Sequence, residues 1–184
     1  MATDTSTPDL ESPASADDLA EALSENETAA FSHLDESGRA RMVDVSDKPV
    51  TRRVAEASCR VLMSAETVRQ LDRLPKGDAY SVARIAGIQA AKRTADWVPL
   101  AHPLPLDEVA IELIPEEDGV VIASRIVCQG RTGAEMEALT ACAAAALALY
   151  DMVKAVERSA VISDLRLEAK SGGQRGDFRR TDGS

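Results

Sequence analysis

The sequence predicts an α+β protein in which helices cover one face of an antiparallel sheet. Three observations support this fold class. Residues 131–154 contain no Pro, one Gly near the start and mostly helix-favouring residues. Four other segments have the apolar pattern of strands, and residues 116–119 have the composition of a hairpin turn. A chain of 184 residues is long enough to form one such domain with a sizeable core.

The expected elements follow in the order strand, helix, helix, strand, strand, helix, strand. Without the first short helix, this is the βαββαβ order of a ferredoxin-like sandwich. The segment 97–106 contains three prolines and is expected to be an extended loop. The predicted ranges are strand 50–63, helices 64–71 and 79–95, strands 106–114 and 120–128, helix 133–158 and strand 161–169.

The long helix at 133–158 carries most of the candidate chemistry. Thr132 and Glu135 have the spacing of a capping box, and the alanine-rich segment 141–146 offers a thin face for close packing. Glu137 and Asp151 differ by about 40° around the helix axis, but about 21 Å of helix separates them. These two carboxylates are therefore expected to share a face and to lie near opposite ends.

The N-terminal segment differs from the rest of the chain in composition. Residues 1–30 hold eight of the 31 acidic residues and no Lys or Arg, which leaves 23 acidic against 21 basic residues elsewhere. We expect residues 1–30 to be a disordered acidic tail, 31–178 to be the ferredoxin-like domain that carries the chemistry, and 179–184 to be a flexible C-terminus.

Composition also argues against several kinds of partner. The chain has no basic block and only five aromatic residues, so we expect no nucleic-acid binding. Cys59, Cys128 and Cys142 have no metal-ligand spacing, and we expect no metal and no cofactor. No secretory leader and no uncharged span of membrane length are visible, and unpaired cysteines suit a reducing compartment, so we expect a cytoplasmic protein without a membrane partner.

Lysine is scarce, and its positions are therefore informative. Only five of the 21 basic residues are Lys. A buried lysine can change its protonation state, whereas an arginine effectively cannot. Candidates for proton transfer or for compact contacts with phosphate are Lys48, Lys76, Lys92, Lys154 and Lys170.

Two loops and one histidine are candidates for ligand binding. Lys76 stands just before the helix 79–95, where an anion is favoured, although a plain turn capped by Asp78 would explain the segment equally well. The Gly-rich segment 170–177 could wrap a phosphate with its N–H groups or could be a flexible tail, and it lacks the order of a P-loop. His102 lies between prolines in a loop, which favours a functional role over a buried structural one.

The long helix adds three further charged candidates. The capping box alone would explain Glu135, whereas the plain alternative for Glu137 is only a solvated position in the first turn. Asp151 and Lys154 are three residues apart, and a partly buried pair of this kind would have perturbed pKa values suited to proton transfer. The plain alternative is a weak ion pair on the surface.

Six segments together carry a recognisable pattern. They are MVDVS (42–46), KGDAYSVARIAGIQAAKRT (76–94), PLAHPL (99–104), TGAEMEALTA (132–141), YDMVKAV (150–156) and AKSGG (169–173). In these segments the chain resembles the cyclic pyranopterin monophosphate synthase family, which acts early in molybdenum cofactor biosynthesis. The resemblance covers residues 33–178 and leaves out the tail.

The resemblance implies a lyase that converts 3′,8-cyclo-7,8-dihydro-GTP into cyclic pyranopterin monophosphate and releases pyrophosphate. It implies a homohexamer, a trimer of dimers, and we expect the sites to lie at the dimer interface. Asp151 and Lys154 match catalytic positions, and we add Lys76 to them as a proton- or phosphate-handling residue. The residues expected to bind substrate are Leu100, Ala101, His102, Glu135, Met136, Glu137, Lys48, Arg53, Lys92 and Lys170.

Two positions depart from the family pattern. Ala101 replaces a usual Cys, so a thiol there is not essential, and Gln174 replaces a common Lys, with Arg175 beside it. The alternative function is a non-catalytic, nucleotide-binding ferredoxin-like module that regulates another protein. Such a module would use the loops of Lys76 and Lys170 but would not need Asp151.

Overall fold

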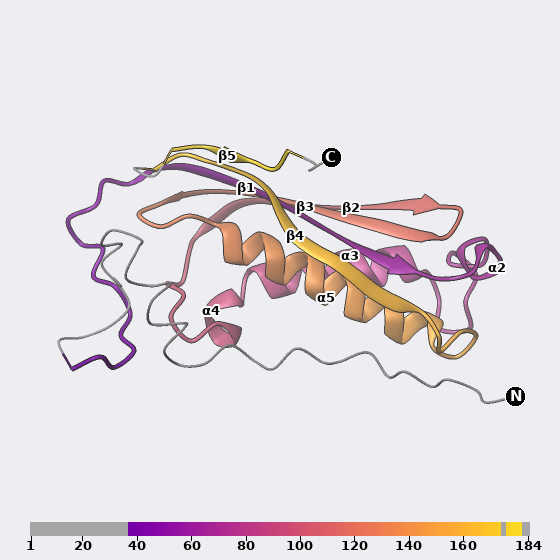
Figure 1. Ribbon diagram of the computed structural model, residues 1–184. Coiled ribbons are helices and arrows are strands. Elements are labelled where there is room, and N and C mark those ends of the chain that lie inside the picture. The colour runs from indigo at the N-terminus through magenta and orange to yellow at the C-terminus, as the bar shows by residue number, and fades with distance from the viewer. Residues whose placement is uncertain (1–36, 174–175, 182–184) are drawn as a thin grey trace, which may run out of the picture. The chain divides into compact units, whose positions relative to one another are not determined.

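The computed structural model describes residues 37–173 and 176–181 (Figure 1). The chain separates into two units, Met1–Arg41 and Met42–Ser184, and the architecture below is that of the second unit. The predicted disordered tail at 1–30 lies outside the described residues, as do Gln174 and Arg175.

One layer of the domain is a five-stranded antiparallel sheet in the order β2-β3-β1-β4-β5. The strands are β1 (Thr51–Leu62), β2 (Leu106–Glu116), β3 (Gly119–Gly130), β4 (Val161–Ser171) and β5 (Phe178–Arg179). β1 lies in the middle and pairs along its whole length with β3, from Thr51 opposite Gly130 to Leu62 opposite Gly119. Its other edge pairs with β4.

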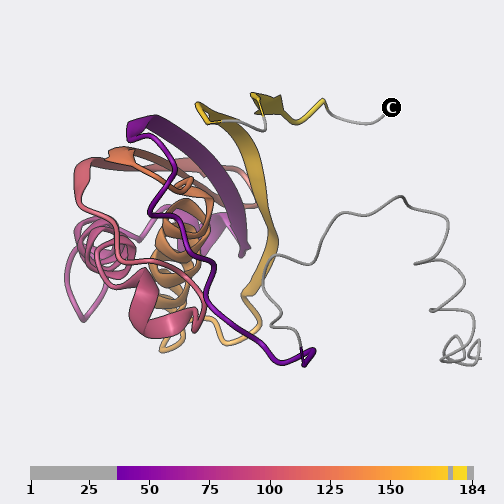
Figure 2. The same cartoon turned by 90° about the vertical axis from the view of Figure 1, so that its left-hand side faces the viewer.

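The helices form the second layer. They are α2 (Ala65–Val68), α3 (Ala79–Ala91), α4 (Thr94–Trp97) and α5 (Glu135–Val153). α3 and α5 lie on the same face of the sheet in both views of the ribbon (Figures 1 and 2). The predicted α+β, ferredoxin-like sandwich with helices on one face of an antiparallel sheet is thus confirmed.

The core lies between the sheet and the two long helices. Alternate residues of β1, among them Ala57, Cys59 and Val61, are at most 1% exposed. The two helices approach each other closely at Gly87 of α3, where an added Cβ would lie 3.0 Å from the carbonyl oxygen of Ala141 in α5. The alanine-rich segment of α5 therefore provides the thin packing face that the sequence predicted.

The ends of α5 differ from the prediction. Its N-cap is Ala134, which makes no side-chain capping bond, so the predicted capping box of Thr132 and Glu135 is wrong. Glu135 is already the first helical residue and cannot occupy the third position that a capping box requires. The helix ends at Val153 rather than near residue 158, and an i→i−3 bond from the Val156 N–H to the Val153 carbonyl tightens the turn that follows.

Two further elements were not predicted. The helix expected at 79–95 ends at Ala91, and a separate turn of helix, α4, follows it. β5 has only two residues and no apolar alternation that a sequence pattern could reveal. Backbone pairing with β4 makes this segment a strand. The Arg180 N–H bonds to the Glu168 carbonyl at 2.7 Å, and Phe178 lies opposite Lys170.

α5 meets the length and hydropathy of a membrane span, with 19 residues and a mean hydropathy of 1.4 in its most apolar window. More than half of that window, 56%, is buried inside the fold. α5 is thus the core helix of the domain, packed against α3 and the sheet.

Candidate active site

The structure brings the three predicted catalytic residues together at the C-terminal end of α5. Lys76 Nζ lies 2.8 Å from Asp151 Oδ2 and also donates to the Asp151 carbonyl oxygen at 2.8 Å. Lys154 Nζ lies 2.7 Å from Asp151 Oδ1. Lys76, Asp151 and Lys154 are called the C-terminal cluster below.

The local fold explains why these side chains meet. Asp151 is in the last turn of α5 and Lys154 is the C-cap three residues later, so they project to the same side. Lys76 comes from the loop between α2 and α3. Buried Leu74 anchors that loop, and Gly77, with a φ of 103°, closes its turn through an N–H bond to the Leu74 carbonyl.

The two ammonium groups control the charge of Asp151. Hydrogen bonds from Lys154, and then from Lys76, lower the pKa of Asp151 to about 2. Asp151 is therefore an anion at neutral pH, and the cluster of two cations and one carboxylate carries a net positive charge. Their side chains are 41–55% exposed, so an arriving ligand can reach them.

A second charged group lies at the other end of α5. Lys170 Nζ is 3.7 Å from Glu135 Oε1. Arg53 is only 9% exposed and donates to the carbonyl oxygens of Gly130 and Arg131, both at 3.3 Å. Arg53, Glu135 and Lys170 are called the N-terminal cluster below.

The Gly-rich loop after β4 packs directly against this cluster. An added Cβ at Gly173 would overlap the guanidinium group of Arg53, and Gly173 has a φ of 92°. Glycine is required there by both space and backbone conformation. Gly173, in the segment predicted to wrap a phosphate or to be a flexible tail, thus lies beside a buried cation.

Glu137 is the most deeply buried of the predicted carboxylates. Its exposed fraction is 4%, and burial raises its pKa to about 7. The nearby charge of Glu135 contributes to this raised pKa. Glu137 can therefore hold or release a proton near neutral pH, which a solvated residue in a first helical turn could not do.

The remaining predicted residues are spread around the domain. Lys48 is exposed, and its carbonyl oxygen accepts a bond from Arg131 Nε at 3.1 Å. Lys92 is the exposed C-cap of α3. In the part of the chain that the structure describes, no side-chain hydrogen bond or ion pair joins either cluster to Lys48, Lys92, Leu100, Ala101, His102 or Met136.

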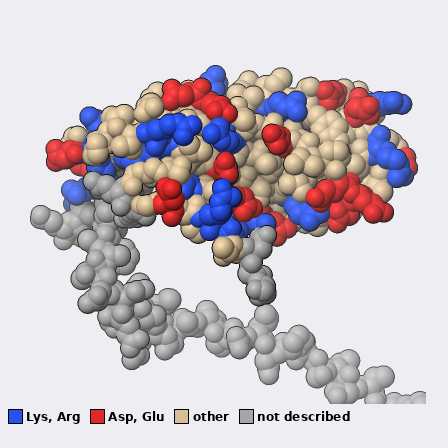
Figure 3. Space-filling model, turned by 90° about the horizontal axis from the view of Figure 1, so that it is seen from above, with Lys and Arg blue, Asp and Glu red and all other residues tan. Residues whose placement is uncertain are grey.

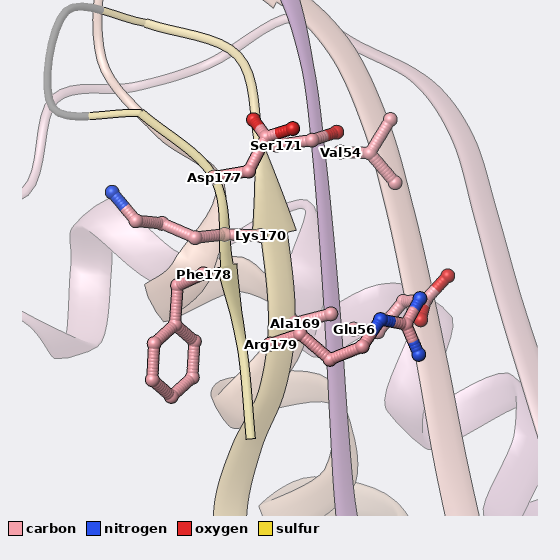
Figure 4. Close-up of a pocket in the computed structure, with 8 residues that line it drawn as sticks. All are labelled: Val54, Glu56, Ala169, Lys170, Ser171, Asp177, Phe178 and Arg179. Atoms are coloured by element: carbon pink, nitrogen blue, oxygen red, sulfur yellow. The ribbon is translucent and has the colours of Figure 1, made fainter. Parts of the chain in front are cut away.

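Basic side chains and a hollow mark the end of the sheet where β1 begins. Seen from the sheet side, Lys and Arg atoms gather toward this end (Figure 3). A hollow of about 290 Å³ lies between β1, β4 and β5 (Figure 4). Its lining includes Lys170, whose side chain points away from Glu56, and contains no member of the C-terminal cluster.

Sequence reasoning missed the contribution of Arg131. It donates to the Lys48 carbonyl, and its own carbonyl accepts from Arg53, so it links two predicted cations. No sequence signal marks a main-chain carbonyl as a partner of a distant arginine. This link becomes visible only once β1 and the end of β3 are paired.

Fold and clusters together define a class of protein: a ferredoxin-like α+β domain with acid–base groups and cations suited to a small anionic ligand. Residues 42–173 match the model of the MoaC family. The chain belongs to this family.

Curated relatives support the same assignment. "Cyclic pyranopterin monophosphate synthase" of Streptomyces griseus is 57% identical over 153 residues, which cover 82% of this chain and 86% of the relative. "Cyclic pyranopterin monophosphate synthase 1" of Mycobacterium bovis is 54% identical over 155 residues, 83% of this chain and 91% of the relative. The synthase of Cereibacter sphaeroides is 54% identical over 154 residues, 82% and 97% of the two chains.

Proposed function

We propose that this enzyme is a cyclic pyranopterin monophosphate synthase of molybdenum cofactor biosynthesis. It is a lyase that converts 3′,8-cyclo-7,8-dihydro-GTP into cyclic pyranopterin monophosphate and pyrophosphate. Membership of the MoaC family and the names of the relatives support the proposal. The structural observation that carries it is the contact of Lys76 and Lys154 with Asp151.

The chemistry requires cations and proton-transfer groups. A hydroxyl oxygen of the ribose-derived part attacks the α-phosphorus, a new P–O bond forms, and the P–O bond to the β-phosphate breaks as pyrophosphate leaves. Lys and Arg side chains stabilise the charge that develops on the leaving group. The proton of the hydroxyl needs an acceptor, and the lysines and carboxylates of the two clusters and Glu137 are the candidates.

The proposal assigns separate tasks to the two clusters. The N-terminal cluster binds the triphosphate. Lys48, Lys92 and His102 share this task. The C-terminal cluster handles protons, with Asp151 holding its two lysines in a fixed arrangement. Residues 31–178 contain all of these groups, so residues 1–30 have no part in catalysis.

The active site in this proposal is shared between two subunits. Glu137 and Asp151 are 14 positions apart on one straight helix, or about 21 Å. If a second copy packs its α5 antiparallel by two-fold symmetry, the start of one helix lies near the end of the other. Glu137 of one chain and Asp151 of its neighbour can then serve one substrate, in a dimer that is the unit of the homohexamer.

Action in the cytoplasm is part of the same proposal. Cys59, Cys128 and Cys142 are buried free thiols, which suits a reducing compartment.

The deciding experiment is turnover of the cyclic dihydro-GTP substrate by the purified full chain. We expect release of one pyrophosphate for each cyclic pyranopterin monophosphate formed. Asp151→Asn is the matched control, since it should bind substrate but release almost no pyrophosphate. Tight binding by the wild-type chain without any pyrophosphate would favour the regulatory module instead.

A further inference from the structure

Glu157 makes an unusual set of contacts just beyond the end of α5. Its carboxylate accepts hydrogen bonds from Thr67 Oγ1 at 2.6 Å, from Ser64 Oγ at 2.8 Å and from the Ser64 N–H at 3.0 Å. Ser64 is the N-cap of α2. One half-buried glutamate thereby fixes the turn after α5 to the start of a helix about 90 positions earlier in the chain.

On one side, this anchor is rigidly connected to Asp151 and Lys154. The Glu157 N–H bonds to the Val153 carbonyl at 2.9 Å, and the Lys154 N–H bonds to the Tyr150 carbonyl at 2.9 Å. Backbone hydrogen bonds from the N–H groups of residues 154, 156 and 157 thus hold this turn to the end of α5. A displacement of Glu157 would therefore displace Lys154, three residues earlier.

On the other side, the anchor leads to Lys76. The segment from Thr67 to Lys76 is pinned by Leu71 and Leu74, which are 0% and 5% exposed. The Gly77 N–H bonds to the Leu74 carbonyl at 2.8 Å and closes the turn that presents Lys76. The loop therefore moves with α2 rather than independently of it.

The ion pairs of the C-terminal cluster cannot supply this rigidity themselves. Lys76 and Asp151 are 41% and 55% exposed, and an exposed ion pair contributes little to stability because solvent and salt screen it. Hydrogen bonds to a carboxylate are stronger than those between neutral groups. Those bonds also lower the pKa of Glu157, with Thr67 contributing most and Ser64 next, so the charged form of the anchor is favoured.

We propose that Glu157 is a positioning residue, which sets the geometry of Lys76, Asp151 and Lys154 by fixing the Lys76 loop to the end of α5. The inference rests on the proposed function, because it assigns Glu157 a role in that same site. Glu157 does not touch substrate. It acts through the three residues that do.

The first test compares Glu157→Ala and Glu157→Gln with Glu117→Ala, a glutamate in the β2–β3 turn with no hydrogen bond or ion pair among the described residues. We expect kcat to fall about 10-fold in Glu157→Ala and less in Glu157→Gln, because a small misplacement of reacting groups is costly. The KM for substrate should change little, because the triphosphate is bound by the other cluster. Glu117→Ala should match wild type.

The second test is a double-mutant cycle with Thr67→Val, which removes the hydroxyl partner of Glu157 and keeps the side-chain shape. If both residues act through one contact, the double variant should lose no more kcat than Glu157→Ala alone. Additive losses, or an unchanged kcat in folded Glu157→Ala, would overturn the proposal. If Glu157→Ala does not fold, Glu157→Gln and Thr67→Val carry the same comparison.

The third test does not depend on turnover. Carboxyl NMR titration of Asp151 in the full chain should show its pKa shifted upward in Glu157→Ala, as Lys76 and Lys154 are released from it. An unshifted Asp151 would contradict the positioning role whatever the activity. If the proposed function itself is wrong, the wild-type chain will release no pyrophosphate, and this result is distinct from the outcome of the Glu157 tests.

Discussion

Lys76 contacts Asp151 twice, through the carboxylate and through the main-chain carbonyl, each at 2.8 Å. The carbonyl is one of those that a helix leaves unsatisfied at its C-terminal end, where the helix dipole is negative. Lys76 therefore neutralises both the side chain and the end of α5. A single lysine from a distant loop caps the helix and completes the charged cluster.

Removal of the Asp151 charge should abolish turnover. Asp151→Asn preserves the shape of the side chain but can no longer hold two ammonium groups as an anion. We expect substrate binding to be retained and kcat to fall by about 1,000-fold, as for loss of an electrostatic group in a site. Calorimetric binding and pyrophosphate release measure the two quantities, and wild-type turnover would refute a catalytic role for Asp151.

Lys76 and Lys170 are expected to affect activity much more than stability. Each Lys→Ala variant should lose about 100-fold or more in turnover, because it removes a cation from one of the two clusters. Both lysines extend from loops or strand ends, and little core packing is lost. Melting temperature should stay near that of wild type, and a decrease in parallel with activity would favour a structural role.

Glu137 should make stability depend on pH. Its ordinary pKa of 4.5 is raised to about 7 in the folded protein. Below pH 4.5 both states are protonated and burial has no electrostatic cost. As pH rises toward 7, the unfolded chain loses its proton first, so the free energy of unfolding falls, and the loss is complete above pH 7.

Glu137→Gln removes this titration and should therefore be more stable than wild type at pH 8, by on the order of 3 kcal/mol. The two proteins should differ little at pH 4. Urea unfolding at both pH values and one protein concentration measures the difference, with Glu117→Gln as the control. An equal difference at both pH values would show that folding does not shift the pKa of Glu137.

A shared active site predicts complementation between inactive variants. Mixing Glu137→Ala with Asp151→Asn, under conditions where subunits exchange, should restore part of the activity. A hybrid dimer would contain one site with both defects and one with neither. With exchange verified by differently tagged chains, a mixture that stays inactive would mean that each site is formed by a single chain.

The acidic tail should be dispensable. Deletion of residues 2–30 is expected to leave kcat, KM and assembly within about twofold of wild type, because every candidate site residue lies after residue 47. Pyrophosphate release and light scattering measure the outcome. A large decrease in kcat would place the tail in the catalytic site.

The sequence predicted the long elements well because their patterns are local. Alternation in β1 and the alanine-rich face of α5 each follow from residues close in the chain, and the structure confirms both. The predicted capping box at the start of α5 was wrong because this pattern is frequent in sequences and tertiary packing can override it. β5 was missed because its two residues are specified by pairing with β4 and not by their own composition.

The sequence predicted which residues belong to the candidate site, but it did not predict most of the contacts between them. Scarcity of lysine singled out Lys76 and Lys154, and helix periodicity related Lys154 to Asp151. The contact between Lys76 and Asp151 spans 75 positions and depends on how α2 and its loop fold back. Burial of Glu137 was also beyond the sequence, since a first-turn glutamate is usually solvated.

No Gly or Pro interrupts α5 between Glu135 and Val153, so one uninterrupted helix joins Glu137 to Asp151. The number of residues between Glu137 and Asp151 sets both their separation and their relative orientation. Deleting one alanine would shorten this helix by about 1.5 Å and rotate one end by about 100° relative to the other. Point substitutions preserve the spacing of Glu137 and Asp151, whereas an insertion or deletion within α5 changes it.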